Sequence, residues 1–168
     1  KNHRHLGGIY PTLVPEHAAC MTAADIVVAG EIAEANELWT DLSLYPKPPS
    51  YAIITPSRGC FFNCSYCAQK TINGDIQKVR HRSPADIVAE IRSKHETYGI
   101  RDFAFYADSL LANFPENFMK VLQMIVKERL QFRLYAPEGL DTRFLGQSQH
   151  LVDLMKAAHF QKIYLPVE

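Results

Sequence analysis

Three of the four cysteines lie close together, and their spacing is the feature of this sequence most suited to chemistry. The segment reads Gly59-Cys60-Phe61-Phe62-Asn63-Cys64-Ser65-Tyr66-Cys67, a CxxxCxxC pattern. Cysteine thiolates hold iron–sulfur clusters, and a cluster usually takes four of them. Three thiolates would leave one iron without a protein ligand, just as catalytic zinc sites keep one position open. We therefore expect Cys60, Cys64 and Cys67 to hold a four-iron four-sulfur (4Fe-4S) cluster whose fourth iron is open to chelation by a small molecule.

Two other kinds of site stay open for the same cysteines. Cys64-Ser65-Tyr66-Cys67 alone matches the CxxC pattern of a redox dithiol, which normally follows a strand and opens a helix. The three cysteines together with His81 match the ligand set of a zinc site. The third cysteine, the preceding glycine and the aromatic residue before Cys67 favour the cluster.

Composition limits the functional classes. A length of 168 residues is room for one domain, or for one domain and part of another. Lys plus Arg equals Asp plus Glu at 18 each, so no global field favours nucleic acid or an anionic membrane. Neither a membrane-spanning run nor a signal peptide is evident, so we expect a cytoplasmic protein with no membrane partner. The short basic run 78–82 is interpreted as a solvated loop.

From residue 51 onward, strand and helix patterns alternate. Strands are expected at 51–55, 103–106, 132–135 and 163–167, and helices at 84–98, 115–130 and 147–158. Ser83 and Pro84 form a typical helix start, and Gly99 a typical helix end. Four βα-type repeats predict an α/β fold with a parallel sheet. The cysteines follow the first strand, at the carboxyl edge where such sheets place their chemistry.

The first 48 residues have a different pattern. A short strand is expected at 25–29 and a helix at 33–42, and the proline-rich stretch 44–50 reads as an extended linker. We therefore predict two domains, 1–48 and 49–168. The missing initial Met and the strand expected at the last residue suggest a piece of a longer polypeptide. A sheet cut in this way would expose an apolar edge, which invites self-association.

The cysteine segment and the units after it resemble the radical S-adenosylmethionine (SAM) superfamily. The resemblance covers roughly residues 51–168 and rests on Cys60-x-x-x-Cys64-x-Tyr66-Cys67, Arg80-His81-Arg82-Ser83-Pro84, Phe105-Tyr106-Ala107-Asp108, and the stretch from Leu154 to Glu168. It implies part, about four units, of a TIM-like (β/α)6 partial barrel. It also implies an iron–sulfur oxidoreductase in which one electron cleaves SAM to methionine and a 5′-deoxyadenosyl radical. That radical abstracts hydrogen from a substrate, small or macromolecular, which the resemblance leaves unnamed.

The resemblance assigns roles to particular residues. Cys60, Cys64 and Cys67 would each bind one iron, and the amino and carboxylate groups of SAM would chelate the fourth. Tyr66 occupies the aromatic position that usually lies against the adenine.

Four further residues are candidate SAM contacts after the later strands. Asp108 would accept from the methionine amino group, although Ala107-Asp108-Ser109 departs from the Gly-Gly-Glu found in many members. Glu168 stands where the family often places a polar residue for the ribose hydroxyls. Glu138 and Arg143 are placed to face the same cavity, with an ordinary exposed loop pair as the alternative interpretation.

Residues 5–42 resemble the tail of the Rossmann-like cobalamin-binding domain that precedes the barrel in one large branch of the superfamily. The cobalt-ligating DxHxxG loop of that domain is expected upstream of this chain. His5-Leu6-Gly7-Gly8 partly mimics it, but His3 stands in place of the Asp, so His5 is interpreted as a surface residue. Cobalamin is therefore implied only for the longer parent protein.

The family resemblance further implies an electron donor of the flavodoxin or ferredoxin type. Two alternatives to an active enzyme remain for this chain: an inactive truncated fragment that survives by oligomerising, and a structural module that binds zinc or a cluster.

Overall fold

The computed structural model describes residues 3–31, 38–73, 79–113 and 115–166. Within the chain, contacts define two compact units, residues 1–38 with 59–78 and residues 39–58 with 79–168. The segment that carries the clustered cysteines thus groups with the N-terminal residues. The predicted domain boundary after residue 48 stays a prediction, because dense contacts within a unit do not show which segment folds independently.

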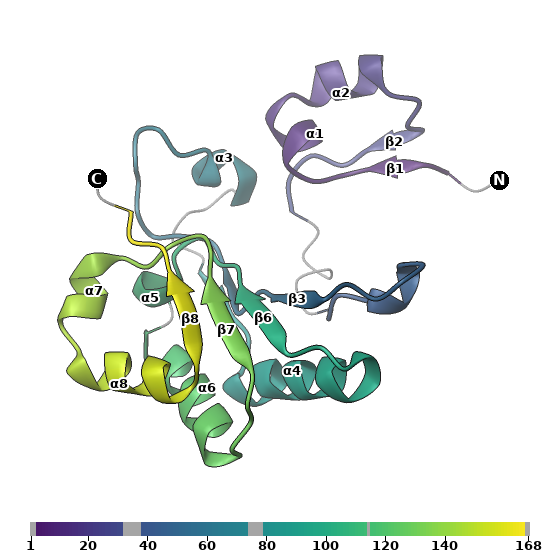
Figure 1. Ribbon diagram of the computed structural model, residues 1–168. Coiled ribbons are helices and arrows are strands. Elements are labelled where there is room, and N and C mark those ends of the chain that lie inside the picture. The colour runs from purple at the N-terminus through teal and green to yellow at the C-terminus, as the bar shows by residue number, and fades with distance from the viewer. Residues whose placement is uncertain (1–2, 32–37, 74–78, 114, 167–168) are drawn as a thin grey trace. The chain divides into compact units, whose positions relative to one another are not determined.

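The larger unit is built on a four-stranded sheet (Figure 1). Its strands, in spatial order, are β3 (Tyr51–Ile54), β6 (Asp102–Phe105), β7 (Arg133–Ala136) and β8 (Phe160–Ile163). Every neighbouring pair is parallel, and the spatial order follows the order along the chain. The predicted α/β fold with a parallel sheet is confirmed.

Helices connect these strands, as parallel pairing requires. The long ones are α4 (Pro84–Tyr98), α6 (Pro115–Lys127) and α8 (Gln149–Ala157). Shorter turns of helix are η2 (Leu42–Leu44), α5 (Leu110–Asn113) and α7 (Thr142–Gly146). The ends predicted for α4 are confirmed, because Ser83 Oγ accepts from the Asp86 N–H at 3.1 Å and Gly99 ends the helix at φ 70°.

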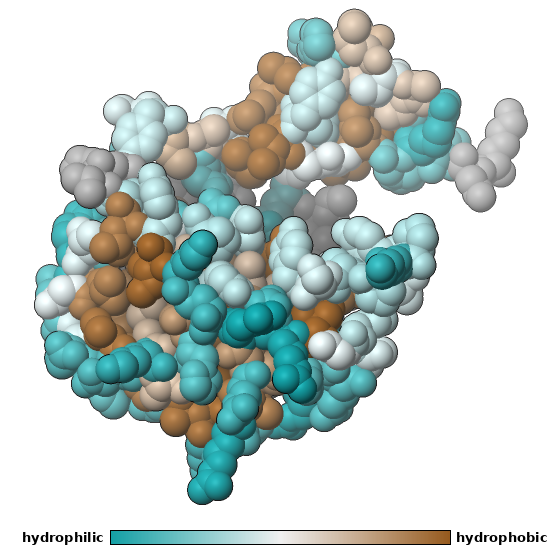
Figure 2. Space-filling model, in the orientation of Figure 1, coloured by the Kyte–Doolittle hydropathy of each residue, from teal (hydrophilic) through white to brown (hydrophobic). Residues whose placement is uncertain are grey.

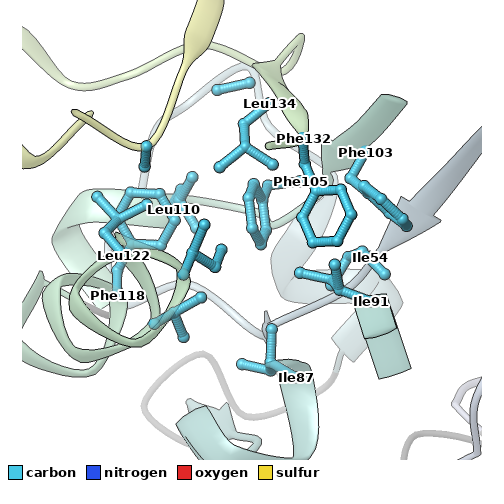
Figure 3. Close-up of a cluster of buried hydrophobic side chains, with 14 of the residues drawn as sticks. Ile54, Ile87, Ile91, Phe103, Phe105, Leu110, Phe118, Leu122, Phe132 and Leu134 are labelled. Carbon is cyan, nitrogen blue, oxygen red and sulfur yellow. The ribbon is translucent and has the colours of Figure 1, made fainter. Parts of the chain in front are cut away.

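The hydrophobic core lies between the sheet and these helices (Figure 3). Aromatic side chains pack edge to face within it, with ring centroids 5.3 Å apart for Phe105–Phe118 and 5.1 Å for Phe103–Phe132. Aliphatic side chains fill the remaining space: Ile54, Ile87, Ile91, Leu110, Leu122 and Leu134. Burying each such side chain contributes about 1.5–3 kcal/mol. This core fixes the carboxyl ends of β3, β6 and β7 along one sheet edge.

The fourth strand begins and ends three to four residues earlier than predicted. The apolar run 163–167 predicts a strand, whereas β8 covers Phe160–Ile163 and pairs with Leu134, Tyr135 and Ala136 of β7. β7 ends at Ala136, directly before Pro137, so the chain beyond Ile163 has no ladder to join. Tyr164 and Leu165 accordingly lie exposed.

The smaller unit contains a two-stranded parallel sheet of β1 (His5–Leu6) and β2 (Ile26–Val27). Between them run α1 (Ile9–Leu13) and α2 (Pro15–Met21), and α1 contacts α3 (Gln69–Asn73). The strand predicted at 25–29 is present as the shorter β2.

The first half of the helix predicted at 33–42, residues 33–37, lies outside the described residues. In its described part, residues 38–41 are not helical, and a 3₁₀ turn begins at Leu42. The Asp41 side chain accepts from the Ser43 N–H at 2.9 Å, which starts this new turn instead of continuing an earlier helix.

Candidate functional site

A short antiparallel ribbon leads into the cysteine segment. After β3 the chain passes Thr55 and Pro56 and forms β4 (Ser57–Arg58), which pairs with β5 (Arg80–His81). Ser57 is 3% exposed, and its Oγ has no hydrogen-bond partner among the described residues. Burial lowers the pKa of His81, the residue opposite Ser57. The ribbon therefore buries Ser57, two residues before Gly59, while Arg58 and His81 are exposed.

The cysteine segment follows as a turn-rich loop. Gly59 is buried and has φ 87°, a conformation that other residues adopt only with strain. Cys60 is half-buried, whereas Cys64 and Cys67 are exposed. The Cys67 N–H donates to the Cys64 carbonyl at 3.1 Å and closes a turn. Helix α3 begins two residues after Cys67.

The chemistry of these side chains fits a cluster. In the part of the chain that the structure describes, no cysteine forms a disulfide, so the three cysteines of the motif are thiols. Among the same residues, no three His, Cys, Asp or Glu side chains are grouped closely enough to hold a single metal ion. The thiolate ligands of a four-iron cluster bind different irons, so they need not converge on one point as zinc ligands do. The zinc alternative, with His81, thus gains no support from this arrangement.

The predicted SAM contacts have different surroundings. Tyr66 lies in the turn between Cys64 and Cys67, with 70% of its surface exposed. Asp108 follows β6 and Glu138 follows β7, and both are exposed. Because β6 and β7 are parallel neighbours, both residues lie in loops at the carboxyl ends of the strands. Glu168 lies outside the described residues.

Arg143 contacts a neighbouring carboxylate. Its Nε donates to Asp141 Oδ1 at 3.0 Å, and Asp141 also accepts from the Arg143 backbone N–H at 2.9 Å, which caps α7. The hydrogen bond from Arg143 lowers the pKa of the Asp141 carboxyl. Glu138 lies in an exposed loop, whereas Arg143 lies on α7, and the role of both toward SAM stays a prediction.

The basic run 78–82 contains a residue whose importance the sequence interpretation missed. The Arg82 side chain is 13% exposed and pairs with Asp86 and Glu90. The interpretation of this run as a solvated loop is therefore wrong for Arg82. The signal was present in the spacing, because charges recur at every fourth position from Arg82, and the last three, Asp86, Glu90 and Lys94, form one row along α4.

A family model now identifies the chain. The model named "Radical SAM superfamily" matches residues 54–168, well over half of the chain. The chain belongs to the radical SAM superfamily. Members of this superfamily are enzymes that use SAM and a 4Fe-4S cluster. The matched residues run from Ile54, the last residue of β3, past β8 and include all three cysteines of the motif.

Two solved structures are similar to this radical SAM chain. Both are of the radical SAM methyltransferase TsrM from Kitasatospora setae, one with cobalamin and a [4Fe-4S] cluster bound and the other with tryptophan substrate and the SAM analogue aza-SAM. Each superposes with a TM-score of 0.57 at 21% sequence identity, over 66% of this chain. This likeness shows the fold. The chain spans about a fifth of the length of TsrM, 21%.

Two negative comparisons complete these findings. No curated protein matches the chain. Among the described residues, no helix combines the length and the apolar character needed to cross a membrane.

Proposed function

We propose that this chain is part of an enzyme that binds a 4Fe-4S cluster through Cys60, Cys64 and Cys67 and reductively cleaves SAM. The observation that carries the proposal is the family match over residues 54–168, which includes a CxxxCxxC motif directly after β3 and β4. When bound, such a cluster supplies the single electron that splits SAM into methionine and a 5′-deoxyadenosyl radical. This cleavage makes the parent protein an oxidoreductase in our proposal.

The cysteine loop has the properties that this role needs. Gly59 lets the chain turn sharply out of β4, and the turn from Cys64 to Cys67 presents two exposed thiols within four residues. Three protein thiolates leave one iron for a small chelating ligand. The amino and carboxylate groups of SAM are such a ligand in our proposal.

The remaining predicted site residues take positioning roles toward SAM. Tyr66 offers an exposed aromatic ring within the cysteine turn, and we assign it to the adenine. We assign Asp108, at the carboxyl edge of the sheet, to the methionine amino group, because an ionised carboxylate accepts hydrogen bonds from ammonium groups. Glu168 is proposed to bind the ribose hydroxyls. Glu138 and Arg143 line the same edge in this proposal.

The proposal assigns no cobalt ligand to this chain. His5 is exposed in β1, and the residue two positions before it is His3 instead of Asp. Cobalamin, which one of the TsrM structures contains, belongs in our proposal to the longer parent protein alone. We further propose a cytoplasmic location and an electron donor of the flavodoxin or ferredoxin class.

Anaerobic reconstitution with iron and sulfide tests the proposal. We expect about four irons per chain. We also expect an electron paramagnetic resonance (EPR) spectrum of the reduced protein that changes when SAM is added, and 5′-deoxyadenosine among the products. Cys64→Ala should lower the iron content severalfold and abolish the SAM-dependent spectral change.

Cys20→Ala is the matched control. Cys20 is an exposed cysteine on α2, outside the motif, so its removal should leave the iron content unchanged. Zinc in place of iron, or equal iron in both variants, would contradict the proposal.

A further inference from the structure

Four charged side chains at the start of α4 and along it form a partly buried network. Glu90 is 1% exposed and accepts from Arg82 on one carboxylate oxygen, at 2.6 Å, and from Lys94 on the other. Lys94 is itself 3% exposed. Arg82 also donates to Asp86 through Nε at 2.8 Å and through Nη2 at 2.6 Å. Two cations and two carboxylates thus balance between α4 and Arg82, which precedes the helix by two positions.

The same guanidinium holds the chain that leads into the cysteine loop. Arg82 Nη1 donates to the Thr55 carbonyl at 3.3 Å, and the Arg82 backbone N–H donates to the Pro56 carbonyl at 3.0 Å. These two carbonyls directly precede β4, and Cys60 follows β4 by two residues. Arg82 therefore fixes the end of β3 against the start of α4.

Stability alone does not explain why charged residues occupy this place. Removing ions from water is costly, and replacing a buried ion network by apolar side chains is often neutral or stabilising. What an apolar side chain cannot provide is a planar group with several donors that binds two carboxylates and a carbonyl at once. The arrangement of Arg82 therefore points to positioning of the segment that it binds.

We propose that Arg82, oriented by Glu90 and Asp86, is a positioning residue for the cluster-binding loop. It fixes the backbone at Thr55 and Pro56, so that the cysteine segment leaves the ribbon in one geometry. This inference rests on the proposed cluster function. It adds a residue of the larger unit to the set on which cluster binding depends.

The test compares Arg82→Lys with Arg92→Lys in the full chain. Lysine keeps the charge but cannot bind three acceptors in the fixed fork of arginine. Arg92 is the matched control, because it lies on α4 and pairs with Glu128 and not with Glu90 or Thr55. Hydrogen exchange of the β4 amides, measured without metal, reports the anchoring directly. It should be about tenfold faster in Arg82→Lys, with β6 amides unchanged, since a charge-assisted hydrogen bond is lost.

Reconstitution supplies the second readout. We expect Arg82→Lys to retain severalfold less iron than the wild-type chain, with a broadened EPR spectrum of the reduced state, and Arg92→Lys to match the wild type. The triple variant Arg82→Met, Glu90→Leu, Lys94→Met fills the site with apolar side chains. It therefore distinguishes loss of positioning from a general loss of stability. It should unfold at a similar urea concentration yet show the same iron loss.

The outcomes separate this inference from the proposed function. A wild-type chain that takes up no iron overturns the proposed function, and the positioning role with it. A wild-type chain that binds iron while Arg82→Lys and the triple variant bind it equally well, with an unchanged spectrum, overturns the positioning role alone.

Discussion

Gly59 links the backbone conformation to the proposed ligands at the scale of a single residue. It is buried, has φ 87° and directly precedes Cys60. A Cβ at this position costs about 1 kcal/mol or more in backbone strain, which the loop can relieve by changing its exit from β4. Gly59→Ala should therefore lower the iron content after reconstitution by more than its effect on folding explains. Iron per chain and urea unfolding measure the two effects.

Gly30→Ala is the control for this prediction. Gly30 also has a positive φ, 90°, and no heavy atom lies within 4 Å of the Cβ that alanine would add. We expect a comparable loss of stability from backbone strain and no loss of iron. Equal iron contents in the two variants would show that the conformation of Gly59 does not matter for the ligands.

Between elements, a cross-strand pair at the amino ends of β6 and β7 gives stability that depends on pH. Asp102 accepts from Arg133 and, at 2.9 Å, from the Tyr135 hydroxyl. These hydrogen bonds, that of Arg133 first, lower the pKa of Asp102 below its usual 3.8. The unfolded chain then binds the proton at a higher pH, so the stabilisation is complete above about 3.8 and is lost as the pH falls through the folded pKa.

Asp102→Asn should accordingly be less stable than the wild type at neutral pH, by up to about 1 kcal/mol, because solvent screens the exposed Arg133 side chain. The difference should shrink as the pH falls below 3.8. Urea unfolding at neutral and acidic pH measures it. A stability gap for Asp102→Asn that stays constant with pH would contradict the assignment.

The elements differ in how well the sequence predicts them. The ends of α4 are encoded locally, by the Ser83 cap and the left-handed Gly99, so they were predictable. The position of β8 depends on where β7 ends, which is a contact between segments far apart in the chain. Arg82 reads as one charge in a basic run, and only the fold brings it to the Thr55 carbonyl. The cysteine spacing could be recognised as a motif from the sequence. The surroundings of Asp108 and Glu138 could not, because they depend on the conformation of the loops that carry these residues.

At the scale of the whole molecule, the described sheet has two edges, β3 and β8. Apolar side chains are exposed at both: Tyr51 and Ile53 on β3, and Ile163 on β8 followed by Tyr164 and Leu165. The visible face of the larger unit also mixes hydrophobic and hydrophilic surface (Figure 2). Unpaired backbone groups beside exposed apolar side chains form a template for pairing with another strand. Self-association stays a prediction, and these edges are where it can be tested.

Ile163→Lys tests this prediction. Lysine on an edge strand discourages pairing, because its charge would have to be buried against a second chain. In sedimentation equilibrium experiments, we expect the weight-average molecular mass of the wild-type chain to rise with protein concentration. For Ile163→Lys we expect a smaller rise. Val152→Lys is the matched control, since Val152 is similarly exposed, at 38% against 41% for Ile163, but lies on α8 away from the edge. A wild-type mass that stays monomeric at every concentration, or two variants that associate alike, would show that the β8 edge does not mediate association.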